Sequence, residues 1–245
     1  MDKIRPFALA VLLALTATAA HARDQFGGFK EYIDRGSLRP FTRDLGGILG
    51  SASFHSGRSL GISGFDVGVH GGMQFKPEAD DKVLRGAGQH LFGLPWAQGE
   101  IGMPFGIDGF IRGVSYQGLT IAGGGLRWGI TKGNDKPWDP NLLISALAHS
   151  VTHTDFSASH ASANLVASVN APYATPYIGV GFDRTRVVVR SSALDPSLAG
   201  EAVVTFEGRV TAGVTVRPWK FIYAQAAYTN AHGQHGADVG LGLRF

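Results

Sequence analysis

Apolar and polar side chains alternate along the last part of the chain, from Ala202 to Phe245. Between Val203 and Val216 the even positions are mostly apolar and the odd positions mostly polar. The final residues repeat the pattern, with an apolar face made of Ala237, Val239, Leu241, Leu243 and Phe245. A period of two predicts β-strands with one apolar and one polar face. Strands of about 10 residues with two such faces, joined by short turns, are typical of a membrane-spanning barrel.

The same period recurs through most of the preceding chain. It begins near Ser59 and predicts strands over residues 65–75, 99–115, 118–131, 141–156, 159–170 and 175–190. With three terminal strands this makes nine, whereas bacterial single-chain barrels have even strand numbers. We therefore predict a weak further strand near Leu49 to Phe54, and an all-β, antiparallel up-and-down transmembrane barrel of about 10 strands, within a range of about 8 to 12. Merging two short segments would give eight instead.

The apolar positions change parity within two of the predicted strands. One change runs from Leu119 to Leu126 across the glycines at 123–125, and a similar one separates Phe182 from Val187. An extra residue in one strand of a pair produces such a change. The three glycines are therefore predicted to form a β-bulge.

The N-terminal part of the chain has a different pattern. Residues 1–22 combine basic residues, an apolar run and a small-x-small site ending at Ala22, which predicts a cleaved secretory signal peptide. Residues 23–52 place apolar side chains at helix-like spacing and predict two short amphipathic helices with a break at Gly36 and Ser37. This segment would lie at the periplasmic rim or plug the lumen, and a disordered leader is the alternative. The barrel would then occupy residues 53–245.

Composition agrees with an exported barrel. The chain has 35 glycines, 17% charged residues and no cysteine, and its formal net charge of +3 gives no case for nucleic acid binding. Two polar segments, Lys76 to Trp96 and Ser191 to Glu201, are predicted as large loops, where barrels carry recognition. Aromatic residues near predicted strand ends or turns fit girdles at the two membrane interfaces: Trp96, Trp128, Trp138, Trp219, Tyr116, Tyr173, Tyr177 and Tyr223.

The signal peptide and the terminal strand GLGLRF together resemble those of Gram-negative outer-membrane β-barrel proteins. The segments SFHSGRSLGISGFDVGV (53–69), GMPFGIDGFIRG (102–113) and TPYIGVGF (175–182) also resemble a poorly characterised family of single-domain barrels with an N-terminal helical segment. The resemblance implies an outer-membrane location, contact with outer-membrane lipid, and recognition of Phe245 by the barrel-assembly machinery. It implies no reaction.

Strand parity places ionisable residues of both signs in the predicted lumen. They are Asp66, His70, Asp108, Arg112, Asp183, Glu207, Arg209, Asp238 and Arg244. One interpretation is a network of internal ion pairs in a closed barrel, because buried charges need partners. The other is a polar lining that admits a small solute, and the mixed signs argue against strong anion or cation selectivity.

One pair of residues could carry catalysis. His160 and Ser162 lie two apart on a predicted strand, share a face, and resemble the His-x-Ser of outer-membrane lipid A deacylases. The pattern departs from that family because Asn164 lies one residue too far on, and no Glu follows before Asp195 to orient the histidine. Two further histidines, His149 and His153, would lie about 13 Å apart on a strand, too far to chelate one ion. We therefore predict no enzyme activity, no cofactor and no metal centre.

The pattern as a whole predicts an outer-membrane barrel that is either a small-solute channel or transporter or a structural barrel. Two alternatives stay open: a lipid-modifying hydrolase that uses His160 and Ser162, and a barrel that binds a partner through its loops.

Overall fold

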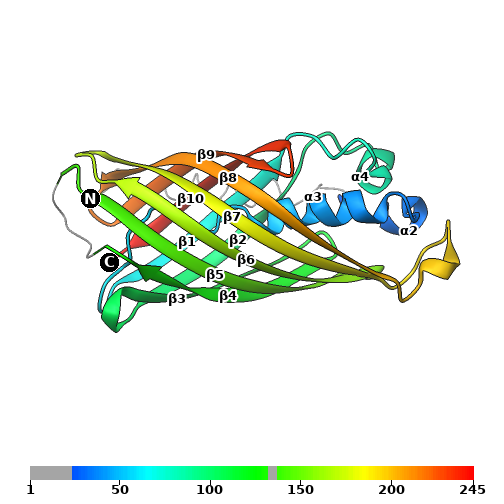
Figure 1. Ribbon diagram of the computed structural model, residues 1–245, viewed down its shortest axis with the longest axis horizontal. Helices are drawn as coiled ribbons and strands as arrows, with labels where there is room; N and C mark the ends of the chain where they lie inside the picture. The colour runs from blue at the N-terminus through cyan, green and yellow to red at the C-terminus, as the bar shows by residue number, and fades with distance from the viewer. Residues whose placement is uncertain (1–23, 132–136) are drawn as a thin grey trace, which may run out of the picture.

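The computed structural model describes residues 24–131 and 137–245, so the predicted signal peptide lies outside the described residues. Ten strands, each antiparallel to its neighbours, close into a barrel in which β1 pairs with both β2 and β10 (Figure 1). They are β1 (Phe65–Gln74), β2 (Phe92–Gly102), β3 (Ile107–Tyr116), β4 (Leu119–Gly129), β5 (Pro140–Thr152), β6 (Phe156–Val169), β7 (Ala174–Val189), β8 (Ala202–Trp219), β9 (Ile222–Ala231) and β10 (Gln234–Arg244). The predicted ten-stranded antiparallel up-and-down barrel is confirmed.

The tenth strand comes from a different segment than the one predicted. Residues 49–54 form no strand, because the helix α3 (Leu38–Gly50) extends into them. Instead, the predicted strand at 99–115 is two strands, β2 and β3, joined by a short turn at residues 103–106. Pro104 has no N–H to donate to a strand ladder, and Phe105 adopts a φ of 65°, which turns the chain. The proline was the sequence signal for this turn.

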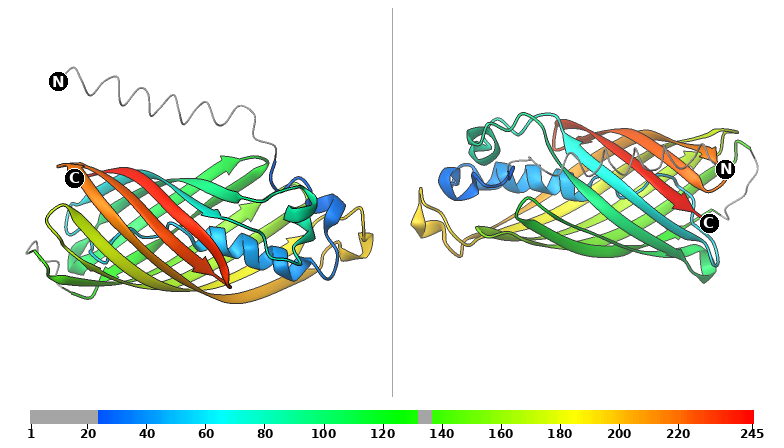
Figure 2. Two further views of the ribbon diagram at one scale, coloured as in Figure 1. Left: turned by 90° about the horizontal axis from the view of Figure 1, so that it is seen from above. Right: turned by 180° about the vertical axis from the view of Figure 1, so that it is seen from behind.

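The predicted helical segment near the N-terminus is present. It consists of α2 (Phe29–Tyr32) and α3, separated by a turn in which the Asp34 carboxylate accepts a hydrogen bond from the Ser37 N–H at 2.8 Å. Figures 1 and 2 show α3 entering the barrel from one end, with α2 outside that end and the C-terminus at the other. Almost every residue of α3 is buried, so the helix fills the lumen. None of the described helices is long and apolar enough to cross a membrane.

Two long connections lie at the end of the barrel that carries α2 (Figure 1). Residues 75–91 include α4 (Lys82–Gly86), and residues 190–201 include the 3₁₀ turn η3 (Pro196–Leu198). The first loop is shorter than the predicted Lys76 to Trp96, because β2 begins at Phe92 and its first residues face the apolar interior. Both loops contact the N-terminal segment: Lys82 pairs with Asp34, and the Ala193 N–H donates to the carbonyl of Lys30 at 2.8 Å.

The three glycines at 123–125 form no bulge. Strand β4 pairs residue by residue with β3 and β5 throughout this stretch. Leu119 faces the interior and Leu126 faces outward, so the apolar positions move from one face to the other while the alternation of side chains continues. Phe182 and Val187 show the same change on β7. The parity change therefore marks the depth at which the interior becomes apolar, next to the N-terminal helices.

The outer face of the barrel carries a belt of exposed apolar side chains. They include Val67, Val69, Ile111, Leu126, Ile144, Leu165, Ile178, Val180, Phe206, Val214, Val239, Leu241 and Leu243. The aromatic prediction is wrong for three residues, because Trp96, Tyr177 and Tyr223 occupy inward positions and are buried inside the barrel. Trp128, Trp138, Trp219 and Tyr173 are exposed near the end that carries the C-terminus.

Candidate functional site

An apolar cluster holds the N-terminal segment at the α2 end of the lumen. Phe29 of α2 lies with its ring centroid 5.0 Å from Phe41 of α3 and 4.7 Å from Phe156 of β6. Phe26 adds two further edge contacts at 6.2 Å. These rings pack with inward-facing aliphatic residues of β2, β4 and β7. Packing of these side chains removes apolar surface from water, and each Å² removed stabilises the packed state by about 25 cal/mol. This burial holds the helix inside the wall.

Two glycines allow α3 to lie directly against β7. A Cβ added to Gly46 would lie 3.2 Å from the Cβ of Thr185 and would overlap its hydroxyl. A Cβ added to Gly50 would lie 2.7 Å from both carboxylate oxygens of Asp183. A side chain at Gly46 would meet the Thr185 side chain, and one at Gly50 would meet the Asp183 carboxylate, so this face of the helix is matched to one strand.

The C-terminal end of α3 is capped by an arginine from the barrel wall. Arg112 of β3 donates hydrogen bonds to the carbonyls of Leu49 at 2.8 Å and Ser51 at 3.1 Å. Its guanidinium also lies 3.8 Å from the ring centroid of Trp96. The last carbonyls of a helix have no partner within the helix, and a cation near them also interacts favourably with the helix dipole. Arg112 therefore serves as the C-terminal cap of the plug.

The chain that follows α3 crosses the rest of the lumen without regular secondary structure, and barrel side chains satisfy its backbone. The Ala52 N–H donates to Asp238, and the Ser53 carbonyl accepts from Arg127, both at 2.8 Å. Farther along, the bonds join Thr215 to the His55 carbonyl, Ser168 to the Gly57 N–H and Asp108 to the Leu60 N–H. Buried backbone groups need such partners. The segment from α3 to Leu60 is therefore bonded to β3, β4, β6, β8 and β10.

Seven of the nine residues predicted to line the lumen are buried inside the barrel: Asp66, His70, Asp108, Arg112, Asp183, Arg209 and Asp238. Glu207 and Arg244 are half-buried near the two ends of the barrel, where Glu207 pairs with Arg43 at 2.9 Å and Arg244 donates to the Ser59 carbonyl. Within the part of the chain that the structure describes, these nine residues contact each other, other wall residues or the plug.

A charged network lies beside Gly50 of the plug. The Nε of Arg209 donates to Asp183 at 2.9 Å, and its Nη2 donates to Asn164 at 2.8 Å. The side chains of Arg209 and Asp183 are only 1% and 4% exposed. His160 lies on the other side of Asp183, with its Nε2 3.7 Å from the carboxylate. The charges of Asp183 and Arg209 are therefore compensated within the wall.

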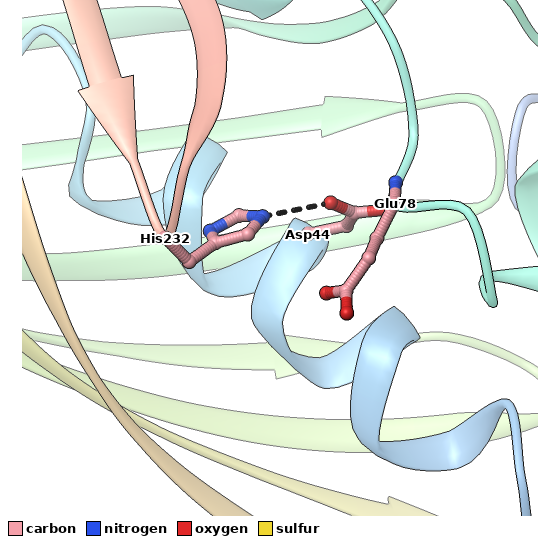
Figure 3. A group of neighbouring side chains, drawn as sticks. All are labelled: Asp44, Glu78 and His232. Carbon is pink, nitrogen blue, oxygen red and sulfur yellow. Dashed lines mark hydrogen bonds and ion pairs between the residues drawn. The ribbon is translucent and has the colours of Figure 1, made fainter.

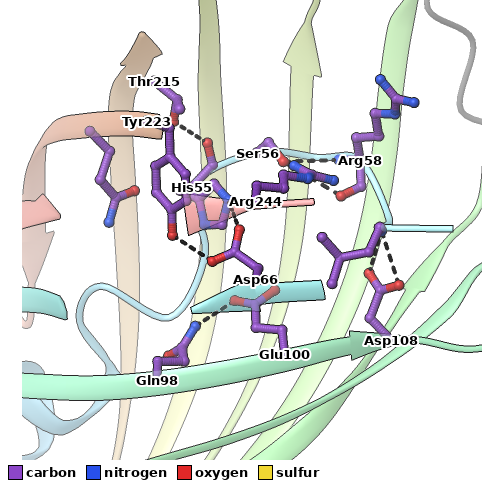
Figure 4. A network of polar contacts seen from close by, with 12 residues as sticks. His55, Ser56, Arg58, Asp66, Gln98, Glu100, Asp108, Thr215, Tyr223 and Arg244 are labelled. Carbon is purple, nitrogen blue, oxygen red and sulfur yellow. Dashed lines mark hydrogen bonds and ion pairs between the residues drawn. The ribbon is translucent and has the colours of Figure 1, made fainter. Parts of the chain in front are cut away.

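A second network fills the lumen toward the end that carries the C-terminus (Figure 4). The Tyr223 hydroxyl donates to Asp66 at 2.9 Å, and the ring of His55 stacks on Tyr223 with centroids 4.6 Å apart. His55 belongs to the segment after α3, so the stacking ties that segment to β9. Nearby, Arg127 pairs with Glu100 at 2.5 Å.

Acidic side chains also gather outside the barrel wall, at the α2 end. Lys82 hydrogen-bonds Asp34 and holds the pKa of that carboxyl at about 2, against the cost of partial burial. Burial raises the pKa of Asp81 to about 8, and the neighbouring Asp44 carboxylate adds to the increase. The loop that contains α4 thus pairs one carboxylate with a lysine and buries another.

The two residues considered as a catalytic pair have other partners. His160 shares a hydrogen bond with the Thr185 hydroxyl at 3.0 Å, and Ser162 contacts Asn164 and Arg209 at 3.4 Å. Both side chains face the filled lumen and are buried. A lipid substrate on the outer face would have no route to them while the plug is in place.

Parity alone would have identified two residues that the sequence argument omitted. Glu100 lies between the outward positions of Gly99 and Ile101, and Arg127 lies between Leu126 and Trp128. Both are buried inward and bond each other, and Arg127 also bonds the plug. The plug segment after α3 carried no comparable signal, because its contacts are with residues far away in the sequence.

No family model matches the chain, and no curated protein matches it. Among solved structures, the N-terminal β-barrel domain of Pseudomonas aeruginosa OprF is 12% identical, covering 76% of this chain and 99% of that one with a TM-score of 0.38. Ail, the attachment invasion locus protein of Yersinia pestis, is 13% identical, covering 75% and 99% with a TM-score of 0.34. The KdgM porin is 7% identical, covering 74% and 99% with a TM-score of 0.35. The assignment of the fold rests on the strand pairing described above.

Proposed function

We propose that this protein is an outer-membrane small-solute channel that its own N-terminal segment keeps closed. The observation that carries the proposal is the position of α3 and the chain up to Leu60, which fill the lumen and are hydrogen-bonded to five strands. The ring of ten strands is complete without this segment. The plug can therefore leave the lumen without opening the wall.

The outer face supports a membrane location. Exposed Val, Ile, Leu and Phe side chains alternate with inward polar ones on β1, β7, β8 and β10. Exposed aromatic residues gather toward the C-terminal end, where Phe245 stacks on Phe221 with centroids 5.4 Å apart. Lipid-facing belts with interfacial aromatics have this form. Recognition of Phe245 by the assembly machinery, and the longer loops facing outside the cell, belong to the same proposal.

The interior supports a weakly selective pathway once the plug is displaced. Acidic and basic side chains alternate around the wall, as in Asp183 with Arg209 and Glu100 with Arg127. Fixed charges of both signs produce no net field that would favour one type of ion. We expect solutes of either charge to pass at similar rates.

Conductance in planar lipid bilayers tests the proposal. The protein lacking its signal peptide is expected to show no steady current, because the plug occupies the lumen. A variant without residues 24–58 is expected to show discrete steps, since the barrel wall is intact and the polar interior fills with water. Heat-modifiable migration on a gel would verify that the variant has folded.

Two outcomes contradict the channel. Steps of equal size and frequency from both proteins would mean that the segment does not close the lumen. Absence of current from the folded deletion variant would favour a purely structural barrel.

A further inference from the structure

Three side chains from separate parts of the chain meet where the plug enters the barrel (Figure 3). Asp44 lies on α3, Glu78 on the loop after β1, and His232 on the turn between β9 and β10. One oxygen or nitrogen atom from each lies within 4.8 Å of the corresponding atoms of the other two. The closest pair is Asp44 Oδ1 and His232 Nε2, at 2.9 Å.

The three residues are enclosed. The side chains of Asp44 and His232 are 0% exposed, and that of Glu78 is 18% exposed. The Glu78 N–H donates to Asp44 at 2.7 Å, and Gln74 donates to the other Asp44 oxygen at 2.6 Å. These contacts orient the Asp44 carboxylate, as the outer contacts of a metal ligand do.

One carboxylate oxygen of the group has no hydrogen-bond partner. Glu78 Oε2 is buried and accepts no hydrogen bond, although Oε1 of the same carboxylate pairs with Arg43. A buried polar atom without a partner is unfavourable. An ion bound by Glu78 would supply the missing interaction.

The charge at this position is unbalanced. Three carboxylates meet here, those of Asp44, Glu78 and Glu207, and the guanidinium of Arg43 pairs with Glu78 at 3.0 Å and with Glu207 at 2.9 Å. The nearby Lys82 is bonded to Asp34 instead. Buried anions need a compensating positive charge. One divalent cation would supply it.

We propose that Asp44, Glu78 and His232 bind one divalent transition-metal ion, of which Zn²⁺ is the ion to test. Two carboxylates and one imidazole suit Zn²⁺, which binds such ligands at about 2.0–2.2 Å. Ligand atoms at that distance lie about 3 to 3.5 Å apart, so the partly exposed Glu78 side chain closes the triangle by a small movement. His232 then binds the ion through the lone pair of Nε2, in place of its hydrogen bond to Asp44, with the imidazole proton on Nδ1. The ion joins the plug, the first loop and the last hairpin.

Metal binding to the untagged, refolded full chain tests this site, and does so independently of conductance. Equilibrium dialysis against Zn²⁺, followed by elemental analysis, is expected to give one bound ion per chain. Asp44→Asn, Glu78→Gln and His232→Ala are each expected to weaken binding by about 100-fold or more, since even outer contacts of a metal ligand contribute about 10- to 100-fold. Co²⁺ in place of Zn²⁺ is expected to give visible absorption that His232→Ala removes.

His235→Ala is the matched control, because His235 is an exposed histidine on the same hairpin and points away from the plug. It is expected to bind Zn²⁺ as the parent does. Glu78→Gln changes a partly exposed loop residue and keeps its size, so the test does not depend on a variant that fails to fold. The proposal is overturned if the parent binds no ion, if Glu78→Gln and His232→Ala bind as tightly as the parent, or if His235→Ala loses the ion equally.

Discussion

Replacing Arg209 with alanine is expected to lower the free energy of unfolding by about 3–5 kcal/mol, the usual cost of removing one partner from a buried ion pair. The substitution leaves the Asp183 carboxylate buried without its guanidinium partner, and it removes a donor from Asn164. Asp183 also lies against Gly50, so loss of the ion pair also affects the contact between the wall and the plug. Urea unfolding in lipid vesicles, followed by tryptophan fluorescence, measures the change.

Two further variants test whether loss of the Arg209–Asp183 ion pair causes the change in the free energy of unfolding. Arg184→Ala removes an outward, exposed arginine from β7 and is expected to change stability by less than about 1 kcal/mol. Arg209→Ala combined with Asp183→Ala removes both charges and is expected to recover part of the loss. A change below about 1 kcal/mol for Arg209→Ala alone would contradict a buried ion pair of Asp183 and Arg209 inside the barrel.

Replacing Arg112 with methionine is expected to release the plug. Methionine preserves apolar contact with Trp96 but leaves the carbonyls of Leu49 and Ser51 buried without donors. Each such group costs about 1–3 kcal/mol. The cost falls on the docked state of α3, because water can solvate both carbonyls once the segment leaves the lumen. Planar bilayers are expected to show intermittent openings that the parent lacks.

Arg186→Met is the control, because Arg186 is an outward residue of β7 with no part in holding the plug. The conductance of each opening in Arg112→Met is expected to equal the conductance of the steps shown by the variant without residues 24–58. Arg112→Met that stays as silent as the parent would show that this cap does not hold the segment in place.

The sequence predicts the barrel well because its terminal strands repeat one simple rule. The alternation from Ala202 to Phe245 follows from one lipid-facing and one inward side, and β8, β9 and β10 form there as expected. The prediction from alternation fails where apolar residues face inward. Leu119 and Val187 looked like evidence for bulges, but they pack on the plug. A rule that equates apolar with outward cannot hold in a lumen that contains a helix.

The candidate site was only partly predictable for a related reason. Parity placed Asp183, Arg209 and Arg112 on the inner face, but it could not pair them, because pairing depends on register and on the side chains themselves. The contacts of the plug depend on residues far away in sequence, such as Ala52 with Asp238. Asp44, Glu78 and His232 are also far apart in the sequence, and they come together only when the barrel closes around the plug.

A disulfide between the plug and the wall tests the central claim, that α3 lies inside the barrel and closes it. The native chain has no cysteine, so Gly46→Cys with Thr185→Cys introduces a single pair. The Cβ positions lie 3.2 Å apart, close to the about 3.5–4.5 Å of natural disulfides. Mild oxidation of the folded protein in membranes is expected to form the bond nearly completely, seen as loss of alkylation by mass spectrometry. Gly46→Cys with Arg184→Cys and Thr185→Ala is the control: it removes the hydroxyl that a Cβ at Gly46 would overlap, its second thiol points outward, and it is expected to stay reduced. Free thiols in the first pair, or equal oxidation of both pairs, would contradict a helix seated against β7 in the lumen.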